Sequence, residues 1–402
     1  MTIDPSPCNW RKQDLAYCSN VHAVENIADL HRVISHFISG VRQARRLEEM
    51  GAGLWFSAAV AAELSAAPDK CLALQALLHA QHIRLFTLNG FPFGNFHAAA
   101  VKEKVYSPDW SQPERMLYTQ NLAKILACCL PDDVAEGTIS TLPLGFRHAW
   151  SEAQQQASVR ALCELAQWLA ELKQSSGRSI RVCLEMEPDC VLESSAEIQA
   201  FFAQELRIHA LCIGMDLAVI NQHLGVCFDV CHQAVMFEDI AAAMAGFLAA
   251  EIRIGKIQVS TALQVQNPAA DKQALRQFVE AKYLHQVRSM HNHALIGALD
   301  LDMALQSETF PENSAWRIHF HVPIQAETLV FSGIDTTQAA IFGVLDFLQM
   351  NPGCRPHLEV ETYTWQVLPS ELRPQHDAAL IAGLTAELLW LEQAMLHRGL
   401  IA

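Results

Sequence analysis

The sequence alternates short apolar runs with longer amphipathic ones, and this alternation restricts its possible folds more than any other feature. Several of the short runs are apolar almost throughout, as strands covered on both faces should be. We expect nine strands, at residues 15–21, 53–57, 83–88, 138–142, 180–186, 225–230, 255–260, 316–322 and 357–363.

Amphipathic segments between these runs predict helices. Across residues 30–41, apolar side chains follow the i, i+3, i+4, i+7 spacing of one buried stripe. Ser194 and Glu197 have the spacing of a capping box and predict a helix start. A leucine-rich stripe over residues 380–395 predicts the last helix, and Gly399 suits its end.

Repeated strand-then-helix units imply a parallel sheet with helices outside, so we expect a single domain over residues 1–402 with a (β/α)8 TIM barrel. A barrel takes eight strands, so one of the nine belongs to an insertion, and the pattern does not say which. Long loop insertions are expected at about 90–115 and 261–315. The first is rich in glycine and aromatics, which suits a mobile lid and equally a static packing loop. An open doubly wound sheet is the alternative, weakened by the absence of a glycine-rich phosphate turn.

Charge and cysteine usage exclude several classes of protein. The net charge is −15, with 28 Lys and Arg against 43 Asp and Glu, and without a basic patch we expect no nucleic-acid partner. No signal-peptide pattern and no apolar run of about 20 residues are visible, so we expect a cytoplasmic protein without direct membrane insertion. The twelve Cys lack metal-finger spacing and are expected to be free thiols, Cys128 and Cys129 being adjacent.

Ionisable residues gather where the later strands are expected to end, which is where the active sites of (β/α)-barrels lie. Residues two apart on a strand share a face, so each of the pairs below should point one way. The group comprises Glu185 with Glu187, Asp229 with His232, Lys256 with Gln258, His319 with His321, and Glu359 with Glu361. Asn20 and His22 after the first expected strand and Asn89 after the third could line the same pocket, although turn chemistry explains them equally well.

Buried carboxylates are costly unless they are paired or bound to a metal. Carboxylate and imidazole ligands suit a divalent ion such as Mn, Mg, Zn, Co or Fe. A purely structural alternative is that Glu185 and Glu187 are neutralised by Lys256 or Arg181. Cys227 and Cys231, which flank Asp229, are expected to be small buried hydrophobes.

These motifs resemble the xylose-isomerase-like barrel superfamily, which includes sugar isomerases, epimerases and apurinic-site endonucleases. Glu185–Pro188 is similar to its Glu-x-x-Pro element, and Asp229 with His232 to its Asp-x-x-His element. The resemblance implies a later ligand from His319 or His321 and a last one from Glu359 or Glu361. In sugar epimerases the strand after the Asp often supplies a His, whereas this chain has Gln258 there.

More narrowly, the chain resembles the metabolite traffic protein branch, the E component of the bacterial Ebo cluster. The resemblance rests on the segments YCSNVH, TLNGFPFGNFH, VKEKVYSPDW, STLPLGF, LEMEPDC, FDVCH, HFHVP and LEVETYTW, which span about residues 15–370. It implies a role in making or moving a secondary metabolite, with other proteins of the same cluster as partners, and names no reaction.

The leading hypothesis is a metal-dependent isomerase or epimerase acting on a small polyhydroxylated metabolite, a sugar or cyclitol. Alternatives are a non-catalytic carrier in a biosynthesis and export assembly, and phosphodiester hydrolysis by a multi-metal site. For the leading hypothesis we assign the metal to Glu185, Asp229, His321 and Glu361, catalysis to Glu187, Glu359, His232 and His319, and substrate binding to Lys256, Gln258, Asn89 and His22.

Overall fold

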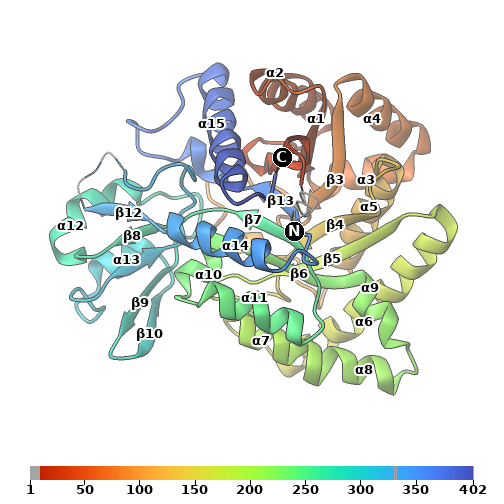
Figure 1. The fold of residues 1–402 in the computed structure, drawn as a ribbon. Coiled ribbons are helices and arrows are strands. Elements are labelled where there is room, and N and C mark those ends of the chain that lie inside the picture. Colours follow the sequence, from red (N-terminus) through yellow and green to blue (C-terminus); the bar gives the residue numbers. More distant parts are fainter. Residues whose placement is uncertain (1–9, 330, 332, 402) are drawn as a thin grey trace, which may run out of the picture.

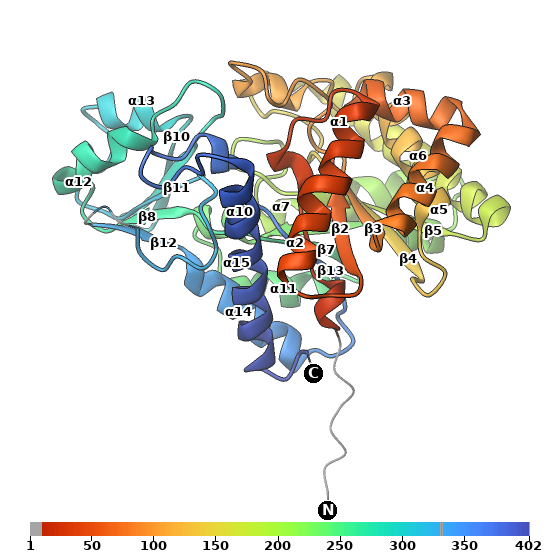
Figure 2. The ribbon, with the colours of Figure 1, turned by 90° about the horizontal axis from the view of Figure 1, so that it is seen from above.

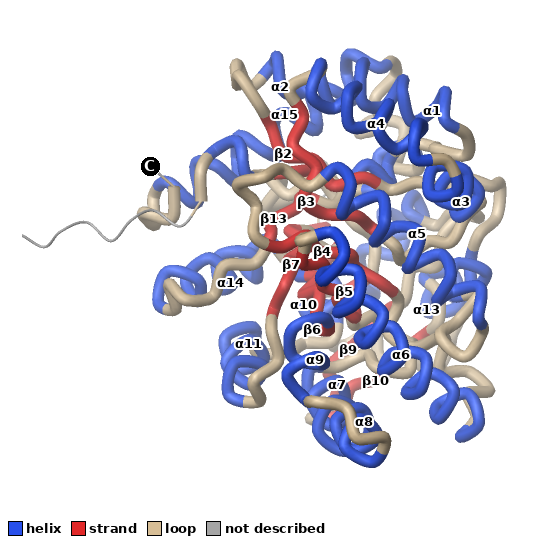
Figure 3. Tube along the Cα trace, turned by 90° about the vertical axis from the view of Figure 1, so that its right-hand side faces the viewer, coloured by secondary structure: helices blue, strands red, loops and turns tan. Residues whose placement is uncertain are grey.

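A parallel eight-stranded sheet forms the centre of the computed structural model, which describes residues 10–329, 331 and 333–401. Its strands follow one another in chain order, and β13 lies between β7 and β1. A parallel bridge between Cys18 and Gly53 joins the two edges, so the sheet closes into the predicted (β/α)8 TIM barrel (Figure 3). The strands are β1 (Ala16–Tyr17), β2 (Met50–Leu54), β3 (Ile83–Asn89), β4 (Glu136–Thr141), β5 (Ser179–Glu185), β6 (Leu224–Asp229), β7 (Ile254–Val259) and β13 (His357–Val360).

Helices surround this sheet and cover its outer face (Figure 1). The predicted capping box is confirmed, since Ser194 accepts a hydrogen bond from the Glu197 amide and the Glu197 side chain bonds back to the Ser194 amide. The described helices around the barrel are α1 (Ile27–Arg32), η3 (Val33–Ile38), α2 (Ser39–Ala44), α3 (Ala58–Ala66), α4 (Pro68–Ala80), α5 (Pro113–Cys129), α6 (Glu152–Ser176), α7 (Ser195–Phe201), η5 (Phe202–Leu206), α8 (Arg207–Cys212), α9 (Leu217–His223), α10 (Val230–Val235), α11 (Ile240–Ala249), α14 (Gln338–Met350) and α15 (Asp377–Leu396).

A second, five-stranded antiparallel sheet interrupts the barrel between β7 and β13 and stands at its side (Figure 2). The expected strand at 316–322 is the one outside the barrel, because β11 pairs antiparallel with β8 and β9. The insertion therefore runs on past residue 315, the end predicted for it, as far as Thr336. Its elements are β8 (Leu263–Val265), α12 (Pro268–Leu275), η6 (Arg276–Phe278), β9 (Val287–His291), β10 (Ala294–Ala298), α13 (Leu301–Gln306), β11 (Trp316–Ile318) and β12 (Ile334–Thr336).

The first two barrel strands differ from their expected bounds. The run at 15–21 is a strand only at Ala16–Tyr17 and then turns into the 3-10 helix η2 (Ser19–Val21). The second strand begins at Met50, before the expected 53–57, because its Met-Gly-Ala-Gly start lacks the β-branched residues that indicate a strand. Three further 3-10 helices are η1 (Lys12–Asp14), η4 (Lys102–Tyr106) and η7 (Tyr363–Gln366).

Among the described residues, one helix, α15, is long and apolar enough by length and composition to cross a membrane. It contains the expected stripe from Leu380 to Met395, and half of its apolar window is buried inside the fold. It packs against α2 and β1, as a core helix of a barrel would. This single helix is therefore weak evidence for a membrane span.

Candidate functional site

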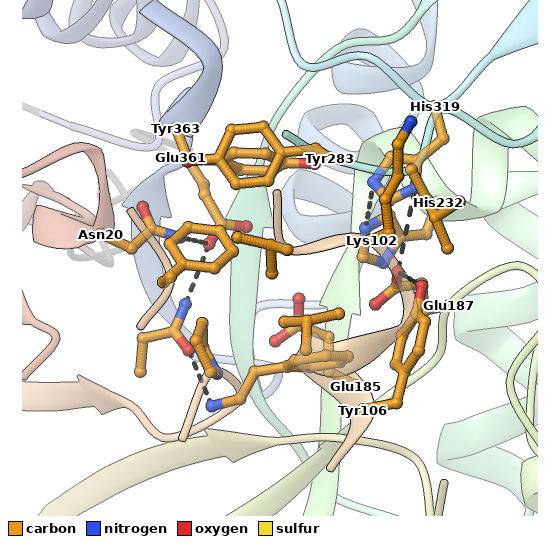
Figure 4. Close-up of a pocket in the computed structure, with 17 residues that line it drawn as sticks. Asn20, Lys102, Tyr106, Glu185, Glu187, His232, Tyr283, His319, Glu361 and Tyr363 are labelled. Atoms are coloured by element: carbon orange, nitrogen blue, oxygen red, sulfur yellow. Dashed lines mark hydrogen bonds and ion pairs between the residues drawn. The ribbon is translucent and has the colours of Figure 1, made fainter. Parts of the chain in front are cut away.

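A pocket opens at the carboxyl ends of the barrel strands, where β3, β5 and β13 end and the two insertions meet (Figure 4). We call it the mouth pocket; its internal volume is about 50 Å³. Its polar lining consists of Asn20, Asn89, Lys102, Glu185, Glu187, His232, His319 and Glu361, and its aromatic lining of Phe91, Phe96, Tyr106, Tyr283 and Tyr363.

Three carboxylates converge at the base of the pocket, and we call them the acidic trio: Glu185, Asp229 and Glu361. Glu185 and Asp229 are the last residues of β5 and β6, and Glu361 directly follows β13. One oxygen of each lies within 4.8 Å of the others, and all three side chains are buried. Parallel neighbouring strands end at one rim of the barrel, which brings together groups far apart in the chain.

The acidic trio is short of compensating positive charge. Burial, with the Asp229 carboxylate nearby, raises the pKa of Glu185 to about 7, and burial with the Glu185 carboxylate raises the pKa of Glu361 well above its usual range. Within the described chain, Glu185 Oε2 and Asp229 Oδ2 have no hydrogen-bond partner. Buried carboxylates with unused oxygens are the donor set that a divalent cation requires.

Glu361, the third member of the acidic trio, is held in place by two asparagine side-chain amides. Asn20 Nδ2 and Asn89 Nδ2 donate to the same oxygen, Glu361 Oε1, at 2.7 and 2.9 Å. Two donors on one oxygen orient the carboxylate and leave the other oxygen for a ligand. Asn89 thus lies in the mouth pocket, as predicted from the sequence, and its side-chain amide contacts the Glu361 carboxylate.

A backbone contact fixes the orientation of the His321 ring, which could therefore hold a metal. Its Nδ1 lies 2.8 Å from the Glu361 carbonyl oxygen, so Nδ1–H donates there and Nε2 keeps its lone pair. Nε2 is buried, has no hydrogen-bond partner in the described part of the chain, and lies 4.0 Å from Asp229 Oδ2. Burial lowers the pKa of His321 to about 4, which keeps the ring neutral, as a metal ligand must be.

His232 and His319 face each other through their second ring nitrogens, with Nε2 to Nε2 at 3.0 Å. His232 Nδ1 lies 2.7 Å from the Met186 carbonyl, and His319 Nδ1 lies 2.7 Å from Gln286 Oε1, so both Nδ1 atoms donate. With both Nδ1 atoms protonated, the two facing Nε2 atoms would both be acceptors, so their contact requires a proton between them. Burial opposes charge on His232, yet Asp229 and Glu187 outweigh it and raise its pKa, whereas burial lowers that of His319. Of the two rings, His232 is the more basic partner in this contact.

A chain of hydrogen bonds connects this histidine pair to Glu187. Tyr106 donates to Glu187 Oε1 at 2.6 Å, and Gln286 Nε2 donates to the Tyr106 oxygen at 3.0 Å while its Oε1 accepts from His319. Burial raises the pKa of Glu187. Tyr106 comes from the insertion after β3 and Gln286 from the larger insertion, so both insertions complete the site.

Lys256 and Glu359 do not reach the mouth pocket. They form an ion pair of 2.5 Å beneath it, and neither side chain is exposed. A Cβ atom at Gly53 would lie 1.1 Å from Glu359 Oε1, so that glycine makes the space for the pair. This placement does not support the substrate contact predicted for Lys256 or the catalysis predicted for Glu359, because each group is occupied in neutralising the other.

Gln258 and His22 also lie outside the lining. The Gln258 amide is wholly buried inside the barrel, between Asp229 and Glu359 in strand register, and makes no hydrogen bond to the described residues. The His22 ring stacks on Phe37 at 4.1 Å, and burial lowers its pKa to about 3. The residue of this turn that reaches the pocket is Asn20, because η2 turns the two side chains apart.

Several lining residues were not singled out in the sequence. Tyr283 belongs to the polar insertion and has no motif around it, as does Gln286, which bonds to Tyr106 and His319 behind the lining. Tyr106 and Tyr363 lie in the quoted segments VKEKVYSPDW and LEVETYTW. An aromatic residue beside a strand-end carboxylate would have been the signal for Tyr363. Cys231 is buried, as predicted, although its sulfur lies within 4.8 Å of His319 and His321 nitrogens.

No protein-family model matches the sequence, and no curated protein sequence matches it. Among solved structures, the chain is similar to a D-tagatose 3-epimerase-like protein (13% identity, TM-score 0.47, 94% of this chain and 98% of the other covered). It is also similar to the 3-keto-D-glucoside 4-epimerase YcjR from E. coli (10% identity, TM-score 0.45, 95% and 99% covered) and to the IOLI protein with a binding zinc atom (11% identity, TM-score 0.47, 95% and 97% covered). At this level of similarity the chemistry has to be argued from the site's own residues.

Proposed function

We propose that the protein is a metal-dependent isomerase or epimerase that acts on a sugar or a cyclitol-type metabolite. The observation that carries this proposal is the acidic trio, buried together at the barrel mouth with unused oxygens beside the neutral His321. A cluster of this kind is costly to bury unless a cation is bound. Polyol hydroxyls would meet carboxylate, amide and imidazole groups in the pocket.

In this proposal Glu185, Asp229, Glu361 and His321 hold one divalent ion. Oxygen and imidazole donors suit Mn, Mg, Zn, Co or Fe. The chemistry that such an ion supplies when bound is Lewis-acid polarisation of a carbonyl or hydroxyl oxygen. Asn20 and Asn89 keep the Glu361 carboxylate in one orientation through their bonds to Oε1.

Glu187 is the proposed base that takes the proton from the carbon beside the substrate carbonyl. It faces the pocket two residues beyond Glu185, and its raised pKa brings its titration closer to neutral pH, where a general base works best. The same carboxylic acid returns the proton to a carbon of the substrate. The His232 and His319 pair, which shares one proton, can move a second proton between substrate oxygens.

The aromatic residues of the lining provide the rest of the binding site. Phe96 contacts Tyr283 and Tyr363, with ring centroids 5.0 and 5.5 Å apart, and together they roof the polar base. Such a roof excludes water and strengthens the electrostatic contacts beneath it. It also suits the apolar face of a sugar ring.

The alternative is a non-catalytic metabolite carrier within a biosynthesis and export assembly. Gln258 favours it, because this buried amide stands at the position where the resemblance to sugar epimerases implies a ligand histidine. A role in a secondary-metabolite pathway, and partners from the same cluster, rest on the motif resemblance and remain part of the proposal.

The test combines metal analysis with solvent exchange. Protein purified without chelator should contain one divalent ion per chain, and chelation should lower its melting temperature, since a ligand present at about 100 times its Kd adds about 2.7 kcal/mol of stability. Asp229→Asn should abolish this metal effect, and Asp69→Asn, an exposed control on α4, should not. An unchanged melting temperature after chelation, with no ion detected, would contradict metal dependence.

Turnover is tested with a panel of ketoses, aldoses and keto-cyclitols in D₂O with added Mn²⁺. An isomerase or epimerase places deuterium on a substrate carbon, and Glu187→Gln should abolish this exchange while keeping the metal. The exposed Glu164→Gln is the matched control. A panel member that binds tightly and never exchanges would favour the carrier.

A further inference from the structure

Three cysteine thiols meet on the outside of the barrel, away from the mouth pocket. Cys71 lies in the first turns of α4, and Cys128 and Cys129 end α5, which lies beside α4 (Figures 1 and 2). Their sulfur atoms all lie within 4.8 Å of one another. Because α5 leads into the start of β4, the cluster is nearer the amino-terminal end of the barrel, opposite the pocket.

The spacing of this three-thiol cluster fits coordination of one ion. Metal–sulfur bonds of about 2.3 Å place neighbouring sulfurs roughly 3.8 Å apart, so the thiols need to close by at most about 1 Å. A disulfide would join two of the thiols and leave the third out. No histidine or carboxylate of the described chain joins the group.

Burial and entry also suit an ion. Cys71 and Cys129 are buried, with 8% and 7% of their surface exposed, whereas Cys128 is partly exposed and opens the cluster to solvent. Gln75 Nε2 donates to the Cys128 carbonyl at 2.8 Å and ties α4 to this end of α5. The site therefore has two buried thiols, one open side and a direct hydrogen bond between its two helices.

The electrostatics favour a cation. Carbonyl oxygens at the carboxyl end of α5 carry the negative end of the helix dipole.

We propose that Cys71, Cys128 and Cys129 form a three-sulfur binding site for a soft monovalent ion, Cu(I). Sulfur-only ligands select soft ions, and three of them satisfy Cu(I), whereas the oxygen and imidazole donors of the mouth pocket suit harder divalent ions. Binding releases the thiol protons to solvent and needs no oxidant. The site is independent of the function proposed for the mouth pocket.

The test is an anaerobic Cu(I) titration of the reduced protein against the chromophoric chelator bicinchoninate. The wild-type chain should retain one Cu(I). Because losing even an outer partner of a ligand costs about 10–100-fold in affinity, Cys128→Ser should bind at least about 100-fold more weakly. Cys212→Ser, an exposed lone thiol on α8, and Cys231→Ser, the thiol beside the mouth pocket, should both bind as wild type.

X-ray absorption at the copper edge then checks the ligands of the wild-type complex without any variant. Three sulfur neighbours are expected. Nitrogen or oxygen neighbours, retention by Cys128→Ser equal to that of the wild type, or loss of binding in Cys231→Ser would each overturn the site.

Discussion

At the scale of single residues, two glutamates two positions apart differ in the groups that compensate their charge. Glu359 lies in β13 and Glu361 directly follows it, and both are buried. Glu359 meets the Lys256 ammonium, which is a full countercharge, whereas Glu361 receives only the amides of Asn20 and Asn89. Amide donors orient a carboxylate without neutralising it, so among the described residues Glu361 has no cationic group in direct contact.

The buried ion pair predicts a strong effect at Gly53. In Gly53→Ala the new Cβ would overlap Glu359 Oε1 and force that carboxylate away from Lys256. Breaking a buried pair costs about 3–5 kcal/mol, so the melting temperature should fall sharply. Gly353→Ala, where a Cβ meets nothing within 4 Å, is the matched control. Equal melting temperatures for the two variants would disprove the role of Gly53.

At the scale of elements, α15 carries a buried carboxylate that joins it to other parts of the fold. Glu387 accepts hydrogen bonds from the Thr362 hydroxyl at 2.6 Å, the Ile324 amide at 3.2 Å and the Trp365 indole at 3.1 Å. These groups belong to the end of the larger insertion and to the segment after β13. Despite the three donors, burial raises the pKa of Glu387 to about 7.

This raised pKa predicts a pH-dependent stability. The folded chain holds the proton up to about pH 7, whereas the unfolded chain loses it near 4.5, so ionisation lowers the free energy of unfolding as pH rises between these values. Relative to the wild type, Glu387→Gln should therefore gain about 2–3 kcal/mol between about pH 5 and pH 8. Urea unfolding at both pH values measures this, with the exposed Glu164→Gln as control. A constant difference would contradict the raised pKa.

The insertion after β3 forms part of the roof of the mouth pocket. The amides of Val101 and Lys102 donate to the Lys282 carbonyl at 2.7 and 2.9 Å, and the Lys102 ammonium pairs with Asp300. The two insertions are thus joined above the pocket. We predict that this junction acts as a lid that opens for entry into the pocket.

Lys102→Gln should loosen the lid by removing the ion pair to Asp300. Amide hydrogen exchange over residues 96–106 should become faster, because the local opening costs less free energy. Lys104→Gln, an exposed neighbour, should leave this exchange unchanged. Equal exchange in both variants would indicate that the ion pair does not hold the segment closed.

At the scale of the whole molecule, charge predicts that the protein does not process DNA. The chain carries a net charge of −15, and its mouth pocket is itself acidic. A duplex has about one negative charge per 1.7 Å of axis, so binding requires several lysines or arginines on one face. A labelled abasic duplex at low salt with Mg²⁺, Mn²⁺ or Zn²⁺ should therefore remain unbound and uncut. Incision would overturn the proposed small-metabolite function.

The sequence by itself determined the barrel and most of the acidic site. Strand and helix periods are local, and parallel strands must end at one rim, so Glu185, Asp229 and a member of the last glutamate pair could be brought together from the chain alone. Only the tertiary structure decided between Glu359 and Glu361, because Lys256 approaches one of them from a neighbouring strand.

The tertiary structure also decided which short apolar run lies outside the barrel and which residues roof the pocket. The run at 316–322 has the apolar pattern of a barrel strand, and the antiparallel partners that place it outside the barrel lie 27 or more residues earlier in the chain. Gln286 and Tyr283 reach the site through that pairing, and His22 turns away from it through η2. Pairing over such distances depends on packing in three dimensions, which the periodicity of a chain does not encode.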